Sequence, residues 1–178
     1  MTDIRERVAE DRTFLKKLEL AIPGFRGYRK KEDRRVADSL LRKQIADRLK
    51  ECVKAAENIR AELASQMELD MIKDAGNLVN RLEALESKVR HAEQGYTGIS
   101  PDIRIFENEI EKLYEFDYGL IEKVNKLADL LGNAKESISI GDMDSLRIQM
   151  LSLKAEIGDF NSLLRRRTEI ITKTGVFA

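Results

Sequence analysis

Apolar residues recur along this chain at alternating steps of three and four positions, which is the spacing of a helix with one buried face. In two stretches, residues 103–131 and 143–171, this alternation continues for about four heptads, which is typical of coiled coils. Glycine and proline interrupt the pattern at residues 22–28, 94–101 and 131–142. The sequence therefore predicts an all-α protein with four helical segments.

The first segment covers about residues 3–21, and the second begins near residue 30 with no strong stop signal before His91. The second segment has two apolar seams, Ile45, Leu49, Cys52, Ala56, Ile59, Leu63 and then Met71, Ala75, Leu78, Leu82, Leu85, Val89, Ala92. Four-residue steps through Met67 join these seams, which changes their phase without ending a helix. We therefore expect one very long helix over about residues 30–93, roughly 90 Å in length. The alternative is a kink or a tight hairpin near residues 65–76.

The third and fourth helices are expected over about residues 102–131 and 142–172. Pro101 and Asp102 suit the first turn of the third helix, and Asp142 suits the N-cap of the fourth. Their seams are Ile103, Phe106, Ile110, Leu113, Asp117, Leu120, Val124, Leu127, Leu131 and Met143, Leu146, Met150, Leu153, Ile157, Phe160, Leu164, Arg167, Ile171.

These two helices should form an antiparallel hairpin around a loop at residues 132–141. Centring the loop near residue 137 sets Arg167 opposite Glu107. The hairpin would pack on the long helix as a three-helix bundle. The predicted fold is thus an elongated helical bundle, or antiparallel coiled coil, and residues 1–178 form one unit made of segments 1–29, 30–93 and 94–178.

Two charged residues, Asp117 and Arg167, occupy positions in the apolar seams. One interpretation is a buried polar contact that fixes the helix register or is relieved by a partner. In the other, a small rotation of the helices turns Phe116 and Leu163 inward while both charges reach solvent. The sequence leaves both interpretations open.

Composition agrees with long helices, because 36% of the residues are charged, 6% are aromatic and none is Trp. The net charge is zero, which disfavours extended binding to nucleic acid. The charge is uneven, with 15 Lys/Arg against 9 Asp/Glu in residues 1–50 and 2 against 7 in residues 91–120. No apolar run approaches the ~20 residues of a membrane span, and no secretory signal is apparent. We expect a cytoplasmic protein, in agreement with the single cysteine.

Catalytic chemistry finds little support in the sequence. One His and one Cys cannot supply the usual zinc, di-iron or nucleophile–base arrangements. Cys52 lies in an apolar seam, as expected of a core residue, and His91 lies near a helix C-terminus, where a cation is favourable. We therefore expect no enzyme, no metal and no cofactor.

Residues 22–35, "IPGFRGYRKKEDRR", combine turn formers, aromatic residues and six basic residues. The candidate patch for an anion, a membrane or a partner protein is Phe25, Arg26, Tyr28, Arg29, Lys30, Lys31, Arg34 and Arg35. A helix start with basic residues suits an anion, and aromatic residues beside basic ones suit an anionic membrane surface. The simpler alternative is a helix–helix turn whose aromatic residues pack on the core.

Residues 107–118, "ENEIEKLYEFDY", form an acidic strip. Its candidate docking residues are Glu107, Glu109, Glu111 and Glu115. They could bind a basic partner, including residues 26–35 of a second copy, or form an ordinary solvated face.

Long amphipathic helices with a basic N-terminal end make the chain similar in kind to membrane-remodelling coiled-coil proteins of the phage-shock and ESCRT-III type. The similarity is one of architecture, and no functional residue is transferred from it. We expect a non-catalytic helical scaffold or protein–protein interaction module that self-associates, since the stripe from Ile45 to Leu63 lacks a partner in the predicted fold. The alternative is a peripheral membrane adaptor that binds anionic lipid through residues 22–35.

Overall fold

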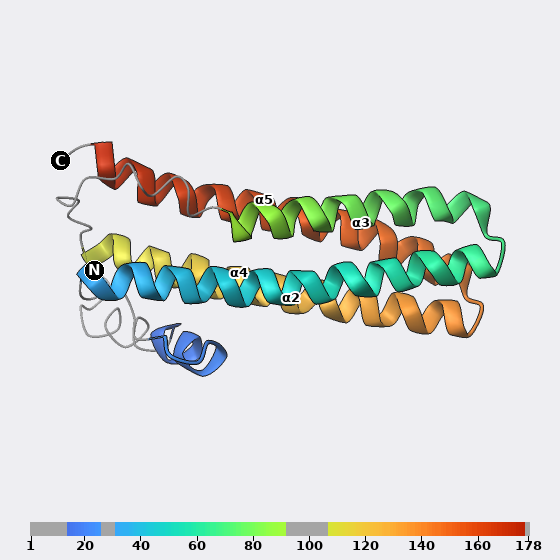
Figure 1. The fold of residues 1–178 in the computed structure, drawn as a ribbon, viewed down its shortest axis with the longest axis horizontal. Helices are drawn as coiled ribbons and strands as arrows, with labels where there is room; N and C mark the ends of the chain where they lie inside the picture. Colours follow the sequence, from blue (N-terminus) through green and yellow to red (C-terminus); the bar gives the residue numbers. More distant parts are fainter. Residues whose placement is uncertain (1–13, 26–30, 92–106, 177–178) are drawn as a thin grey trace, which may run out of the picture.

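The computed structural model is an all-α bundle in which long helices pack as antiparallel pairs (Figure 1). The described residues are 14–25, 31–91 and 107–176, with only the helical backbone described for 31–36, 107–111 and 171–176. The long helices are α2 (Lys31–Ser65), α3 (Leu69–Arg90), α4 (Glu107–Ser139) and α5 (Met143–Val176). A short helical segment, residues 14–21, precedes them.

The predicted single helix over residues 30–93 is wrong, because the chain reverses its direction at residues 66–68. The alternative tight hairpin near residues 65–76 is the arrangement that forms. As a result α3 folds back along α2 and covers its apolar seam within the same chain (Figure 1).

Backbone hydrogen bonds end α2 in a defined way. Met67 N–H donates to the Ala64 carbonyl oxygen at 3.2 Å, and Glu68 N–H donates to the Leu63 carbonyl oxygen at 3.0 Å. This pair of bonds is the Schellman motif, which requires a left-handed residue after the helix. Met67 takes that place with φ of 60°, although glycine is the usual residue there.

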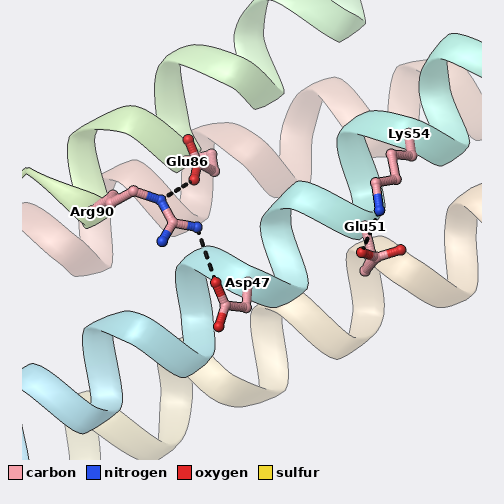
Figure 2. A network of polar contacts seen from close by, with 5 residues as sticks. All are labelled: Asp47, Glu51, Lys54, Glu86 and Arg90. Carbon is pink, nitrogen blue, oxygen red and sulfur yellow. Dashed lines mark hydrogen bonds and ion pairs between the residues drawn. The ribbon is translucent and has the colours of Figure 1, made fainter.

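Ion pairs fasten the far end of α3 to α2 (Figure 2). The Arg90 guanidinium lies between Glu86 of its own helix, with Nε 2.5 Å from Oε1, and Asp47 of α2, with Nη2 3.0 Å from Oδ1. The neighbouring pair of Glu51 and Lys54, 2.8 Å apart, stays within α2. Exposed pairs of this kind add little stability, but Arg90 marks the point along α2 at which α3 ends.

The predicted hairpin of the third and fourth helices forms, but the expected loop at residues 132–141 is wrong. α4 continues to Ser139, and Gly132 lies within it on an exposed side. The turn repeats the Schellman motif, with Gly141 N–H donating to the Ile138 carbonyl oxygen at 3.1 Å and Asp142 N–H to that of Ser137 at 2.9 Å. Gly141 has φ of 75°.

The predicted N-cap of α5 is confirmed. Ser145 N–H donates to Asp142 Oδ1 at 3.0 Å. Hydrogen bonds from the side chain and backbone of Ser145 hold the pKa of Asp142 below its usual value. Because the turn lies later than expected, Arg167 does not fall opposite Glu107 and instead reaches Asp117.

The two hairpins lie side by side with both turns at one end, so that α2 runs parallel to α4 and α3 parallel to α5 (Figure 1). The described part of the chain therefore contributes four long helices to the bundle, and the predicted three-helix bundle is wrong. α3 has 22 residues, whereas the other three have 33 to 35. Of the described long helices, α2, α4 and α5 continue beyond the end of α3. We call the end of the bundle beyond α3 the open end. We call the opposite end, which contains residues 66–68 and 140–142, the turn end.

The N-terminal segment packs on α2 and α4 near the open end. Leu18 and Ile22 are completely buried. The ring centroid of Phe14 lies 5.8 Å from that of Tyr118 on α4, and Arg48 Nη2 of α2 donates to the Ala21 carbonyl oxygen at 3.4 Å. The segment thus covers part of the surface between α2 and α4.

The predicted seams form the core. Every described seam residue of the long helices is buried except Met143, which is partly buried, and α4 adds Ala134 and Ile138 because it is longer than expected. None of the helices in the described part of the chain has an apolar stretch long enough to span a bilayer.

Candidate interaction surfaces and a buried charge cluster

Four charged side chains lie buried together at the open end. Arg167 of α5 lies between two carboxylates, with Nε 2.5 Å from Asp117 Oδ1 on α4 and Nη2 2.6 Å from Asp38 Oδ1 on α2. Arg42 Nε lies 2.7 Å from Asp38 Oδ2. The exposed fraction of the four residues ranges from 0% for Asp117 to 7% for Asp38 and Arg42. Two positive and two negative charges make this charge cluster neutral.

The sequence indicated two members of the cluster and missed the other two. Asp117 and Arg167 stand out because they interrupt apolar seams, and the interpretation in which both reach solvent is wrong. Asp38 and Arg42 were missed because an acid and a base four residues apart usually form an exposed pair on a helix surface.

The charge cluster connects the two hairpins, since α2 belongs to one and both α4 and α5 belong to the other. Removing a single partner from a buried ion pair leaves an uncompensated charge and costs about 3–5 kcal/mol. Replacing all partners by apolar residues is often neutral or stabilising. We therefore interpret the cluster as a determinant of how the hairpins align and not as a source of net stability.

A second buried charged site, also missed, lies between α4 and α5. Glu156 is 3% exposed. Its Oε1 lies 2.9 Å from Lys123 Nζ and its Oε2 lies 2.8 Å from Lys126 Nζ. Burial disfavours the charged carboxylate, but hydrogen bonds from Lys126 and Lys123 outweigh burial and lower the pKa of Glu156. This site joins two helices through an ionised group.

Only part of the candidate basic patch lies in the described region. Arg26, Tyr28, Arg29 and Lys30 are outside the described residues, and for Lys31, Arg34 and Arg35 the helical backbone alone is described. Phe25 is 4% exposed, and its ring centroid lies 6.4 Å from that of Tyr114. The Phe25 ring is therefore part of the core, as expected from the alternative of a helix–helix turn whose aromatic residues pack on the core.

The acidic strip lies at the start of α4. The side chain of Glu115 is described and exposed, whereas those of Glu107, Glu109 and Glu111 are outside the described side chains. Because α2 and α4 run parallel, the basic start of α2 and the acidic start of α4 lie at the same end of one chain (Figure 1).

The apolar stripe that suggested self-association is covered within the chain. Its members are each at most 2% exposed: Ile45, Leu49, Cys52, Ala56, Ile59 and Leu63. Both α3 and α4 pack against α2. Any association between copies therefore has to use a different surface.

The single Cys and the single His of the chain lie in different surroundings. Cys52 is buried, and burial together with the charge of Glu51 raises its pKa to about 11. Its thiol is therefore protonated at neutral pH and a poor nucleophile. His91 is exposed at the end of α3. Within the described ranges no group of three or more His, Cys, Asp or Glu could hold a metal ion.

Large apolar side chains that remain exposed gather toward the turn end. Among the described residues these are Met67, Leu69, Ile140, Ile148 and Leu151, which are 65–83% exposed, and the sixth such residue, Leu20, lies elsewhere. The first three lie in or beside the two turns. Ile148 and Leu151 follow within the first nine residues of α5, or about 13 Å of helix. We call these five residues the exposed apolar group.

A surface hollow of about 250 Å³ lies between α3 and α5. It is lined by Arg81, Ala84, Leu85, Lys88, Ile157, Gly158 and Asn161. A Cβ atom added at Gly158 would meet nothing within 4 Å, which shows how much room the missing side chain leaves. Lys88 Nζ donates to Asn161 Oδ1 at 3.3 Å across the hollow.

Comparison of the chain with protein-family models, with curated proteins and with solved structures found no match. Inferences about function therefore depend on the residues and geometry of this molecule.

Proposed function

We propose that this protein is a non-catalytic helical scaffold that binds protein partners through the exposed apolar group. The observation that carries the proposal is the gathering of Met67, Leu69, Ile140, Ile148 and Leu151 toward one end, each at least 65% exposed. Large apolar side chains that gather on a protein surface are typical of interaction sites. Methionine is well suited to such a surface because its side chain adapts to different partners.

The filled core supports this proposal. The chain's own helices bury the four apolar seams, so the exposed apolar group is not needed to complete the fold. Self-association, which the sequence suggested, cannot use the stripe from Ile45 to Leu63, since that stripe is buried. The exposed apolar group is an alternative surface for it.

Site-specific photo-crosslinking in living cells tests the proposal. A photoreactive residue replaces Leu69 or Leu151 in separate variants, and Leu20, equally apolar and 87% exposed, is the control position. We expect discrete adducts from positions 69 and 151 and none from position 20. An adduct with the mass of two chains would identify self-association. A folded protein without adducts at positions 69 and 151 would contradict the proposal.

A peripheral membrane role for residues 22–35 is the second candidate, favoured by their basic and aromatic composition. Since Phe25 is buried, lipid binding would depend on the basic side chains and Tyr28. Flotation with anionic liposomes at low and physiological salt, comparing wild type with Tyr28→Ser, tests this role. Flotation that Tyr28→Ser abolishes would favour it, and absence of flotation at both salt concentrations would remove it.

A further inference from the structure

α5 has two rows of residues at alternating three- and four-residue steps, and only one row is buried. The inner row, from Leu146 to Arg167, faces the core. The members of the outer row are all exposed: Asp144, Ile148, Leu151, Ala155, Gly158 and Ser162. Their steps of four, three, four, three and four are those of a coiled-coil seam. The outer row therefore has the spacing of a surface on which another helix packs.

The outward faces of the neighbouring helices differ from this row. At the same spacing α2 exposes Lys43, Asp47, Lys50, Lys54 and Glu57. α4 exposes Glu122, Lys126, Asp129 and Asn133. These faces are polar throughout, as expected for helix surfaces that are exposed to water. Among these three helices, α5 alone has large apolar side chains in its outer row, namely Ile148 and Leu151.

The size of the side chains changes along the outer row. Ile148 and Leu151 are large, whereas Ala155, Gly158 and Ser162 are small. Interaxial distances between packed helices depend on the side chains at the contact, and small residues permit close approach. The row therefore suits a rod-shaped partner that lies over Ile148 and Leu151 and approaches the α5 backbone closely at Gly158.

The border of this row toward α3 is basic. Arg81 and Lys88 line the same hollow as Gly158. Within the described residues Arg81 forms no ion pair, and the hydrogen-bond partner of Lys88 is the neutral side chain of Asn161. Arg147 and Lys154, two turns apart on α5, are paired with Asp144 at 3.9 Å and with Asp74 of α3 at 2.9 Å. Within the described residues, the positive charges of this border that lack an acidic partner are therefore those of Arg81 and Lys88.

We propose, as an extension of the proposed function, that the outer row of α5 docks an amphipathic helix of a partner protein, with acidic residues along the edge that meets Arg81 and Lys88. Charge complementarity selects this occupant. A second copy would bring the same basic border to the interface twice. An anionic membrane would match the charge, but a flat surface has no use for the small residues at Ala155 and Gly158.

Two synthetic peptides of about three heptads test this docking. Both have Leu at the alternating positions, and they differ only in having Glu or Lys beside them. Fluorescence anisotropy with the full chain, at about 50 and 150 mM salt, compares their affinities. We expect the Glu peptide to bind about tenfold more tightly than the Lys peptide, with a difference that shrinks as salt rises.

Three variants of the full chain complete the experiment. Leu151→Ser/Ala155→Arg should abolish binding of the Glu peptide, while Leu20→Ser, the matched apolar control, should leave it unchanged. Arg81→Glu/Lys88→Glu should reverse the preference toward the Lys peptide. Such a reversal cannot come from unfolding, because an unfolded variant loses both peptides.

Other results would overturn the docking proposal. Equal affinity for both peptides would contradict the proposal that the partner helix has acidic residues along its edge. No binding of either peptide, with crosslinking at position 151 intact, would overturn this docking mode and leave the proposed function standing. An adduct of two chains at position 151 would show that a second copy, and not a partner helix, occupies the row. Liposome flotation that Leu151→Ser abolishes would show that a membrane occupies it. Loss of crosslinking as well would remove both proposals.

Discussion

The α2–α3 and α4–α5 hairpins turn at the same end of the bundle and close with the same pair of backbone hydrogen bonds. They differ in the residue that takes the left-handed conformation, which is Met67 with φ of 60° in the first and Gly141 with φ of 75° in the second. A left-handed L-residue costs about 1–2 kcal/mol, whereas glycine has no such cost. The first turn is therefore strained and the second is relaxed.

This difference shows that local sequence does not impose the first turn. The apolar seams on either side of Met67 both have to be buried, and folding α3 onto α2 buries each against the other. A straight helix would have left them facing water. Packing over the whole hairpin thus outweighs the strain at one residue, and it leaves the Met67 side chain exposed at the turn end.

The largest expected effect concerns the contact between the hairpins. Arg167→Ala leaves Asp38 and Asp117 buried without their shared cation, so we expect a loss of about 3–5 kcal/mol in the free energy of unfolding, measured in urea. The adjacent Arg166 is exposed, and Arg166→Ala should change stability little. Similar losses for the two variants would mean that the cluster does not hold the hairpins together.

Asp117→Leu, at the same cluster, tests alignment. This variant leaves an excess positive charge in the core and should also destabilise the protein. A gain in stability with an unchanged oligomeric state would contradict the interpretation that the cluster aligns the hairpins.

A smaller effect is expected within the α4–α5 hairpin. Because the pKa of Glu156 is lowered, its ionised form stabilises the fold above the usual glutamate pKa, and this contribution is lost as pH falls through the folded pKa. Glu156→Gln should therefore cost about 1.5–3 kcal/mol at pH 7. Urea unfolding should show the difference from wild type shrinking below about pH 4. If the stability difference between Glu156→Gln and wild type is the same at pH 7 as below about pH 4, the ion pairs of Glu156 are not its cause. Glu136→Gln, at an exposed site, is the control.

Gly141→Ala tests the relaxed turn. A Cβ atom there meets nothing within 4 Å, so any loss comes from the backbone conformation. We expect a loss of about 1–2 kcal/mol. Gly132→Ala is a matched control, since Gly132 is equally open but helical, and it should gain about 0.5–1 kcal/mol. Thermal or urea unfolding measures both changes in stability. If both variants gain or both lose stability, the left-handed conformation of Gly141 is not what determines the effect.

Met67→Gly tests the strained turn and has the smallest expected effect. Relief of the left-handed strain, reduced by the greater freedom of glycine in the unfolded chain, should raise the free energy of unfolding by about 0.5–1 kcal/mol. Ala61→Gly, at an exposed position within α2, should lose a similar amount. A loss at position 67 would show that the methionine side chain stabilises the turn.

Sequence reasoning located the interaction sites only in part. Asp117 and Arg167 could be identified because they are charges in apolar seams. Asp38 and Arg42 could not, because nothing in their spacing separates a buried pair from an exposed one. The outer row of α5 was missed for a related reason, since Ile148 and Leu151 stand outside the inner seam and single apolar residues are common on surfaces. Only the exposure of all members of the row shows that they form a face.

The sequence by itself determined that the chain is helical and which face of each helix is buried, because periodic apolar spacing acts over one or two turns. It also determined the start of α5, where Asp142 is a local cap. The tertiary structure decided where the long helix folds back, how the charge cluster is assembled and which apolar residues stay outside. These features depend on contacts between residues up to 129 positions apart, as from Asp38 to Arg167. A local pattern has no information about such contacts, since their energies arise only when the hairpins pack together.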